Sequence, residues 1–445
     1  MDYKRFLNYY GLHLQPPVIR QIVSATPSGV NKSASAGFPN PTAFPIGSAT
    51  FDLKDGTQIR FTEEEMNVAL QYGKSKGQDD FLDLLYKMQC EEHHPPTASV
   101  EAGPSKMSIL MSPGAQMALF TFAMVCVSDG IPIIFSTPCF AVMSAPLVDF
   151  IHNALCVEVD ADGTVPSSLR SVLSKWTPQD ANNPQSGIPR ILWLNPTCNN
   201  PAGVTTSAER RKEIYAIAQE YNLFIVEDDP YYYLQENRPR IPSYLSIDVD
   251  GRVLRFDSFS KVISPGLRCA YVTGPAEIVK GMEYVFMQSS QHVSVLSQMI
   301  IHKLLKKWGP AGFEDHVQRI VAFNREKRLH ALAMADHWLK GFAEWNIPPG
   351  GMYIFLKVYD TGLTSVELNK KLMETHKVTV IPATGFYPKD AKMNDVAVLR
   401  VSIVMAEADE MAMVMKGLAQ VIKEAQTAYV KKNDQVKIQT AVIKS

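Results

Sequence analysis

Short apolar runs separated by longer amphipathic stretches dominate the first two thirds of the chain. The runs show no alternation with polar residues, which is typical of strands buried on both faces of a parallel sheet. The stretches between them place apolar residues at helical spacing, for example at 79–91 and 207–220. The pattern predicts an α/β fold with strands at 107–111, 131–135, 155–159, 191–194, 224–227, 253–256 and 270–273.

The last third of the chain has a different pattern. It is mainly helical from 275 to about 345, then mixes strands at 352–358, 378–381 and 398–403 with helices at 365–376 and 406–425. A chain of 445 residues is too long for one small core. We therefore expect an N-terminal arm at 1–50, a large domain at 51–310 with a mostly parallel seven-stranded sheet between helices, a smaller α+β domain at 311–428, and a loose polar tail at 429–445.

Charge and cysteine content narrow the functional classes. With 44 basic and 45 acidic residues the formal net charge is −1, so nothing favours nucleic acid or a membrane as a partner. The six cysteines are scattered without a C-x-x-C pair, which is typical of reduced thiols inside the cell. The N-terminus does not read as a secretory signal. We expect a protein of the cytoplasm or the mitochondrial matrix, without a bound metal ion.

A lysine among small hydroxyl residues carries the clearest candidate chemistry. Ser258, Ser260 and Lys261 follow one predicted strand, and Arg268 precedes the next. A desolvated lysine near a cation has a lowered pKa, so its neutral amine can attack an aldehyde. Two hydroxyls and a guanidinium suit a phosphate dianion. A lysine for a Schiff base beside a phosphate cup is what pyridoxal phosphate requires. The alternative is an exposed lysine in a Ser-rich loop.

Two further motifs follow predicted strands, at the edge where open α/β sheets bind ligands. In the loop from Asn195 to Gly203, two prolines and a glycine hold Asn200 rigidly. In the second, Asp228 or Asp229 lies just beyond a strand, three or two residues before Tyr231. A carboxylate there would keep a pyridine nitrogen protonated. Spacing alone does not decide between the two acids, and an ordinary turn and a solvated acid are the alternatives.

Three other features are weaker. Gly114, Ala115 and Gln116 join a strand to a helix, a turn that can hold an anion. Arg400 lies inside an apolar strand, where it needs an anion such as a substrate carboxylate or a structural ion pair. Phe140 follows a strand end and is suited either to stack on a flat ring or to join the core.

Together these motifs resemble those of the fold-type I, pyridoxal phosphate-dependent aminotransferases. The chain is most similar to the branch of kynurenine/2-aminoadipate and aromatic aminotransferases, from Pro17 to about Lys423. The stretches that carry this resemblance are Leu70 to Gly73, Glu227 to Gln235 and Gly251 to Lys261. The resemblance implies the large and small domains of that fold, with the arm over the active site. It also implies a homodimer with composite sites.

The resemblance implies roles for individual residues. Lys261 would form the Schiff base and move the substrate's α-proton, Asp228 rather than Asp229 would pair with the pyridine nitrogen, and Tyr231 would complete the catalytic set. The cofactor-binding residues would be Tyr72 (toward the neighbouring subunit's phosphate), Ala115, Gln116, Phe140, Asn200, Ser258, Ser260 and Arg268. The substrate-binding residues would be Arg20, Gly37, Asn200, Tyr353 and Arg400. Phe140 stands where the family often has Tyr, and Ala115 where close relatives have Ser.

The expected activity is ping-pong transamination. An aromatic amino acid, kynurenine or 2-aminoadipate would give its amino group to a 2-oxo acid such as 2-oxoglutarate. A lyase or decarboxylase on the same fold is the alternative. Arg400 argues against decarboxylation because it would retain the carboxylate. A non-enzymatic regulator that binds pyridoxal phosphate would need a basic helix-turn-helix extension, whereas only a Pro-rich arm precedes the fold.

Overall fold

A computed structural model of the chain describes residues 1–19, 21, 37–128, 130–140, 153–387 and 396–444. Its main element is an eight-stranded mixed sheet in the order β3-β10-β9-β8-β7-β4-β5-β6. The strands are β3 (Met107–Ser112), β4 (Ile133–Thr137), β5 (Ala154–Asp160), β6 (Gly163–Thr164), β7 (Ile191–Leu194), β8 (Phe224–Asp228), β9 (Val253–Ser258) and β10 (Ala270–Pro275). The seven predicted strands are confirmed, and the two-residue β6 adds an eighth at the edge.

The sheet is mostly parallel, as expected. Strands β9, β8, β7, β4 and β5 run in one direction, and β10 runs against both of its neighbours, β3 and β9. Since β3 and β9 both oppose β10, they are parallel to each other. The carboxyl ends of β3, β4, β7, β8 and β9 therefore meet at one edge of the sheet.

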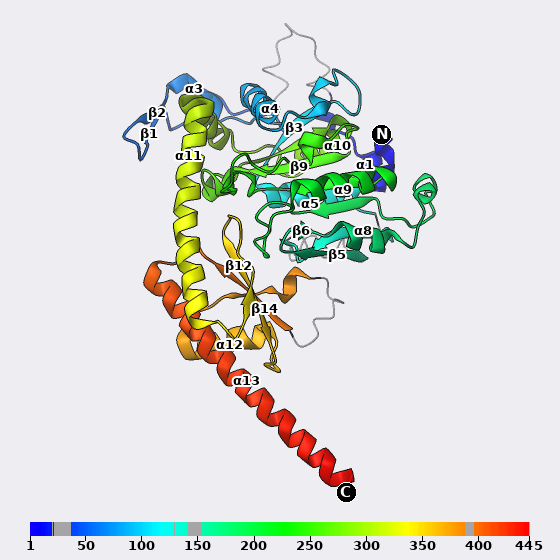
Figure 1. The fold of residues 1–445 in the computed structure, drawn as a ribbon. Coiled ribbons are helices and arrows are strands. Elements are labelled where there is room, and N and C mark those ends of the chain that lie inside the picture. Colours follow the sequence, from blue (N-terminus) through cyan, green and yellow to red (C-terminus); the bar gives the residue numbers. More distant parts are fainter. Residues whose placement is uncertain (20, 22–36, 129, 141–152, 388–395, 445) are drawn as a thin grey trace.

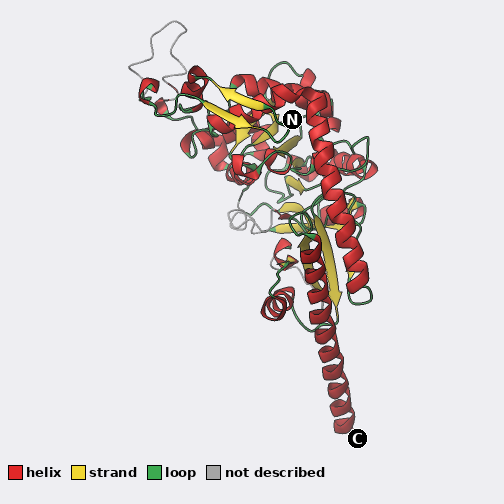
Figure 2. Ribbon diagram, turned by 90° about the vertical axis from the view of Figure 1, so that its left-hand side faces the viewer, coloured by secondary structure: helices red, strands yellow, loops and turns green. Residues whose placement is uncertain are grey.

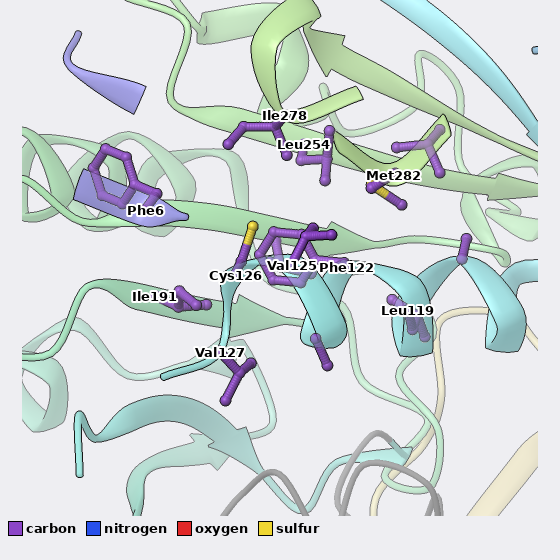
Figure 3. Packing of buried hydrophobic residues seen from close by; sticks show 14 of the residues in the cluster. Phe6, Leu119, Phe122, Val125, Cys126, Val127, Ile191, Leu254, Ile278 and Met282 are labelled. Carbon is purple, nitrogen blue, oxygen red and sulfur yellow. The ribbon is translucent and has the colours of Figure 1, made fainter. Parts of the chain in front are cut away.

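Helices cover both faces of this sheet (Figures 1 and 2). On one face α5 (Ala115–Cys126) and α10 (Ala276–Gln288) form the largest apolar cluster. Figure 3 shows Leu119 and Phe122 of α5 beside Leu254 of β9. On the other face lie α8 (Pro166–Leu173) and α9 (Ala208–Glu220). Strand β7 contributes Trp193 to the first cluster and Leu192 to the second, which explains its continuous apolar sequence.

The first residues of the chain differ from the expected arm. A 3₁₀ turn (Tyr3–Phe6) and α1 (Tyr9–His13) lead into the main core instead of lying over its surface. The Tyr3 hydroxyl donates to the carbonyl of Gly251 at 2.9 Å, and the Phe6 ring lies 5.3 Å from that of Phe224. Figure 3 shows Phe6 in this cluster. This segment is too short to show a periodic apolar pattern, although Tyr3 and Phe6 are buried.

A hairpin and two helices precede β3. Strands β1 (Ala49–Asp52) and β2 (Gln58–Phe61) pair antiparallel, and neither was predicted. Helix α3 (Glu63–Ala69) begins at the predicted capping box, in which Thr62 and Glu65 each accept from the other's backbone N–H. Helix α4 (Asp79–His93) follows. Further 3₁₀ turns lie at 41–43, 96–99, 178–182, 232–234, 245–247, 259–261, 265–267 and 383–386.

The second sheet has four antiparallel strands in the order β11-β12-β14-β13. They are β11 (Glu344–Trp345), β12 (Tyr353–Tyr359), β13 (Ile381–Pro382) and β14 (Val396–Ser402). Helices α12 (Ser365–His376) and α13 (Ala408–Lys444) pack on them. The predicted α+β pattern is confirmed. The expected loose tail is not found, because α13 continues through it to Lys444 and extends away from the body (Figures 1 and 2).

Helix α11 (Val295–Trp338) runs the length of the molecule and reaches both sheets (Figure 1). Gly309 interrupts it with φ +60° and ψ −176°, a conformation outside the helical region, and Pro310 follows. α11 is thus two straight helices joined at a kink. Neither α11, α13 nor any other described helix is long and apolar enough to cross a bilayer.

Candidate active site

Two loops meet at the start of strand β10. In the registers of the three strands, Ser112 of β3 and Ser258 of β9 both pair with Ala270 of β10. The turns after β3 and β9 therefore start at one level, and Arg268 lies two residues before this point. Arg268 has φ +50°, and its guanidinium lies against Gly114, where a Cβ would come within 2.2 Å of Nη2. Gly114, at φ +90°, permits this close approach.

The sequence-predicted phosphate ligands converge at this point. Ala115 and Gln116 open helix α5, and the guanidinium of Arg268 lies against its N-cap, Gly114, where the first-turn N–H groups have no partner within the helix. The hydroxyl oxygen of Ser258 accepts from the N–H of Ser260 at 3.2 Å, which shapes the turn that carries the lysine. A positive guanidinium and a helix N-terminus together favour a bound anion.

Lys261 ends this turn, half-buried, with its ammonium nitrogen 6.0 Å from the centre of the Tyr231 ring. Tyr231 is itself buried after β8, and its hydroxyl lies 3.3 Å from that of Tyr353 at the start of β12. Burial raises the pKa of the Tyr231 phenol well above its ordinary value, and the neighbouring Tyr353 adds to this shift. Tyr231 is therefore neutral at physiological pH and can donate a hydrogen bond.

The structure distinguishes Asp228 from Asp229, which the spacing of the residues alone does not do. The carboxylate of Asp229 already has partners in the protein, since one of its oxygens accepts hydrogen bonds from Thr197 and from Arg255, each at 3.0 Å. Asp228 is equally buried, but within the described part of the chain its carboxylate accepts no hydrogen bond and forms no ion pair. Burial, followed by the charge of Asp229, raises the pKa of Asp228 to about 7. A buried carboxyl group without a partner is suited to a cationic ligand.

Behind these acids lies a buried charge cluster that the sequence analysis missed. Arg255, fully buried, contacts Glu227, Asp229 and Asp257 at 3.2, 3.0 and 2.8 Å. Burial lowers the pKa of its guanidinium, but the three carboxylates outweigh this and raise the pKa. The only sequence signal was an arginine and two acids inside apolar strands, which requires mutual pairing. The cluster fixes Asp229 and thereby the backbone of Asp228.

Asn195 is a second residue that sequence reasoning missed. Its side-chain oxygen accepts from the N–H of Asn200 at 2.7 Å, while its amide nitrogen donates to the carbonyl of Asp228. One side chain thus ties the β7 loop to the end of β8 and fixes the relative positions of Asn200 and Asp228. Asn195 belongs to the same Asn-Pro motif as Asn200, so the motif pointed to the loop although the choice of residue was incomplete.

Arg400 on β14 faces the same place from the second sheet. Its guanidinium donates to the side-chain oxygen of Asn200 at 2.9 Å and lies 4.5 Å from the Tyr353 ring centre and 5.4 Å from that of Phe386. Among the described residues no carboxylate pairs with it, and its buried Nε has no hydrogen-bond partner. Within the described part of the chain no structural ion pair holds Arg400, and its remaining donors are suited to a carboxylate ligand.

Of the remaining predicted residues, Phe140 lies near Arg400, Tyr72 and Gly37 are on the surface, and Arg20 is outside the described residues. Phe140 is half-buried and packs against the cluster that contains Phe386. Tyr72 is 50% exposed and contacts Phe38 and His292, with ring centres 5.9 and 6.0 Å apart. Gly37 is exposed beside Phe38, with no atom within 4 Å of a Cβ placed on it. Arg20 lies outside the described residues.

Comparison with known proteins decides the family. The family model described as aminotransferase class I and II matches residues 53–418. The chain belongs to this family. The enzymes of this family depend on pyridoxal phosphate, which confirms the expected enzyme class. The predicted branch is also confirmed: this aminotransferase is 36% identical over 432 residues to the mitochondrial kynurenine/alpha-aminoadipate aminotransferase of Bos taurus, covering 96% of the chain and 100% of that relative.

Other relatives agree. The mitochondrial kynurenine/alpha-aminoadipate aminotransferase of Mus musculus is 36% identical, again over 96% of this aminotransferase and 100% of the relative. A crystal structure of an aminotransferase from Candida albicans has a TM-score of 0.83 at 22% identity, covering 96% of this chain and 99% of that one. That likeness confirms the predicted fold class.

The residues of this aminotransferase fit pyridoxal phosphate. The group requires an anion cradle, an amine, a carboxylate for a ring nitrogen and a donor for a phenolate oxygen. The Gly114–Arg268 contact leaves no room for a side chain at the cradle. The buried Asp228 carboxyl group lacks a partner among the described residues, and Tyr231 is a neutral phenol beside Lys261.

Proposed function

We propose that this aminotransferase transfers an amino group from kynurenine, 2-aminoadipate or an aromatic amino acid to a 2-oxo acid such as 2-oxoglutarate. The reaction is ping-pong, so the first 2-oxo acid leaves before the second binds. The observation that carries the proposal is Arg400, a half-buried cation without an acidic partner among the described residues and in contact with Asn200 and Tyr353. The names of the bovine and mouse relatives support these donors and a mitochondrial location.

Each residue then has one task. Bound pyridoxal phosphate supplies an aldehyde and a ring that withdraws electrons from the substrate's α-carbon. Ala115, Gln116, Ser258, Ser260 and Arg268 hold the phosphate. Asp228 pairs with the ring nitrogen, whose positive charge stabilises the ionised carboxylate and lowers its raised pKa.

Tyr231 and Asn200 would donate to the phenolate oxygen, and Phe140 would stack on the ring. Arg400 binds the substrate's α-carboxylate through the donors that the protein leaves free. Lys261 would bond the aldehyde, and its released amine would take the proton from the substrate's α-carbon and return it. Arg20, Gly37 and Tyr353 line the side-chain end of the substrate.

A substrate screen with an Arg20→Ala variant tests the donor assignment. We expect kcat/KM for 2-aminoadipate to fall far more than kcat/KM for methionine, because Arg20 pairs with the distal carboxylate that methionine lacks. Truncating one partner of a desolvated charge pair costs roughly 2–5 kcal/mol, so the two effects should differ by more than about tenfold. Stopped-flow or coupled assays on purified protein measure both donors. An equal fall for both would leave Arg20 a structural residue and remove support for an acidic donor.

We also propose a homodimer in which Tyr72 of each subunit reaches the other subunit's phosphate. Tyr72 and Phe38 are half-exposed aromatic residues on one patch, and the side chain of Gln71 donates to the carbonyl of Pro39 at 2.9 Å, joining the two loops. Exposed aromatic residues of this kind are typical of protein interfaces.

Hybrid dimers test this assembly. Mixing Tyr72→Phe with Lys261→Ala subunits should give hybrids in which one of the two sites carries neither change. Refolded mixtures should therefore exceed the mean activity of the two parent variants at equal protein concentration. Light scattering provides the control, and a fully active monomer at the working concentration would contradict the proposal.

A further inference from the structure

A large cavity lies behind the candidate active site, apart from it. It has a volume of about 1030 Å³ and is bounded by α4, by the loop at 232–247 and by α11 near its kink. This volume lies at the upper end of the range for small-molecule sites. None of the described residues assigned above to cofactor or substrate lines it. It is therefore a second concave site in the same chain.

The walls of the cavity are aromatic and apolar. Tyr233 and Phe313 meet edge to face, with ring centres 5.2 Å apart at 82°, and Tyr232 lies beside Tyr233 at 5.4 Å. Leu84 and Met88 of α4 complete the apolar side. Such walls bind a flat apolar body by stacking and by excluding water.

One of the cations that line the cavity has no acidic partner among the described residues. Among the described residues, four lysines and arginines and three glutamates line it. Lys87 and Arg238 each form an ion pair with one of these glutamates and Arg240 with two, at separations of up to 3.7 Å. Lys306, the fourth cation, is exposed on α11 and has no acidic partner among the described residues. The lining thus carries one net positive charge, which favours an anion over a neutral or cationic ligand.

The cavity also touches two elements that connect it to the active site. Tyr232 and Tyr233 follow directly after Tyr231, whose hydroxyl lies 3.3 Å from that of Tyr353 in the second sheet. In addition, the cavity is lined by Leu305 before the Gly309 kink and by Phe313 after it. A molecule bound there contacts both halves of α11 and the turn that positions Tyr231.

We propose that this cavity binds an aromatic organic monoanion, such as an aromatic carboxylate, and that its occupation alters catalysis through Tyr231 and the α11 kink. The apolar body lies between Leu84, Met88 and the tyrosine rings, and the acidic group pairs with Lys306. The binding claim does not depend on the proposed substrates, because no described residue of that site lines the cavity.

The probe is 8-anilinonaphthalene-1-sulfonate, an aromatic monoanion that fluoresces on entering apolar sites. We expect saturable binding to the holoenzyme with one site per chain. Lys306→Glu should weaken it by more than the two- to fivefold typical of losing one exposed ion pair, since it reverses the net charge. The double variant Leu84→Trp/Met88→Trp should reduce it further by filling the cavity. Lys212→Glu, an exposed lysine on α9, is the matched control and should bind as the parent does.

A further variant shows where the probe binds. Arg400→Ala should keep full probe binding if the probe lies in the cavity and lose it if the probe lies in the active site. Probe binding should also change kcat in the parent enzyme and leave kcat unaltered in Lys306→Glu at the same probe concentration. Circular dichroism confirms that each variant is folded. Parent-like binding by folded Lys306→Glu, or loss of binding in Arg400→Ala, would overturn the proposal.

Discussion

Replacing Lys261 with alanine should abolish both transamination and the visible absorbance of bound pyridoxal phosphate. Lys261 is the described lysine that lies over the Tyr231 ring, and it stands on the turn that Ser258 and Ser260 shape. Without its amine no protein group bonds the aldehyde or carries the α-proton, and the loss of an activated nucleophile removes the covalent route altogether. Absorbance spectra and a coupled assay measure the two effects.

The control for this result is Lys280→Ala. Lys280 lies on α10 over the ring of Tyr284, away from the turn after β9, and its loss should leave both spectrum and turnover unchanged. Normal turnover by Lys261→Ala would mean that the proposed site is in the wrong place, whatever the family of the chain.

The second large effect is expected at Asp228. Replacing it with alanine should lower kcat on the order of 10²-fold or more, the scale of one preorganised electrostatic partner. The physical reason is that Asp228 is buried, without a protein partner in the described residues, and has a pKa raised to about 7, so that it gains most from a cationic ring nitrogen. Single-turnover kinetics separate this effect from cofactor loss, which an absorbance titration follows.

Asp229→Ala is the contrasting variant, and its effect should be on folding. Asp229 pairs with the fully buried Arg255, and breaking a buried pair by removing one partner costs roughly 3–5 kcal/mol. A lower denaturation midpoint with a smaller change in kcat per folded site is the expected result. The reverse outcome, with Asp229 carrying the loss of kcat and Asp228 none, would move the assignment by one residue.

The sequence predicted the large sheet well because its signal is local. Continuous apolar runs such as 191–194 need no knowledge of their neighbours to be recognised as buried strands. The N-terminal segment failed for the opposite reason. Phe6 is buried only because Phe224, more than two hundred residues away, provides the surface it packs on. The helical tail failed because composition was taken to mean disorder, whereas the polar residues of α13 are good helix formers.

In the site, too, residues with a local sequence signal could be predicted, whereas partnerships between distant residues could not. Lys261, Asn200 and Arg400 carry chemistry that a motif displays, so they could be named from the sequence. The choice between Asp228 and Asp229 depends on which carboxylate Arg255 occupies, and that is a property of three strands placed side by side. Asn195 likewise acts across two loops. Partnerships between distant residues have no period or spacing in one sequence, so they become visible only in the fold.

The pairing of strand β10 limits where residues can be inserted into the chain. The strand is paired on both sides, and the same residue, Ala270, sets the level of the turns after β3 and β9. Inserting one residue between Arg268 and Ala270 would shift the register of β10. The side chains that follow in the strand would turn to the opposite face, and Arg268 would be separated from Gly114. An insertion in the surface segment at 183–187 disturbs no strand pairing. Natural variation in length, and any designed insertion, should therefore be confined to segments like the latter, while the distance from Arg268 to Ala270 stays fixed.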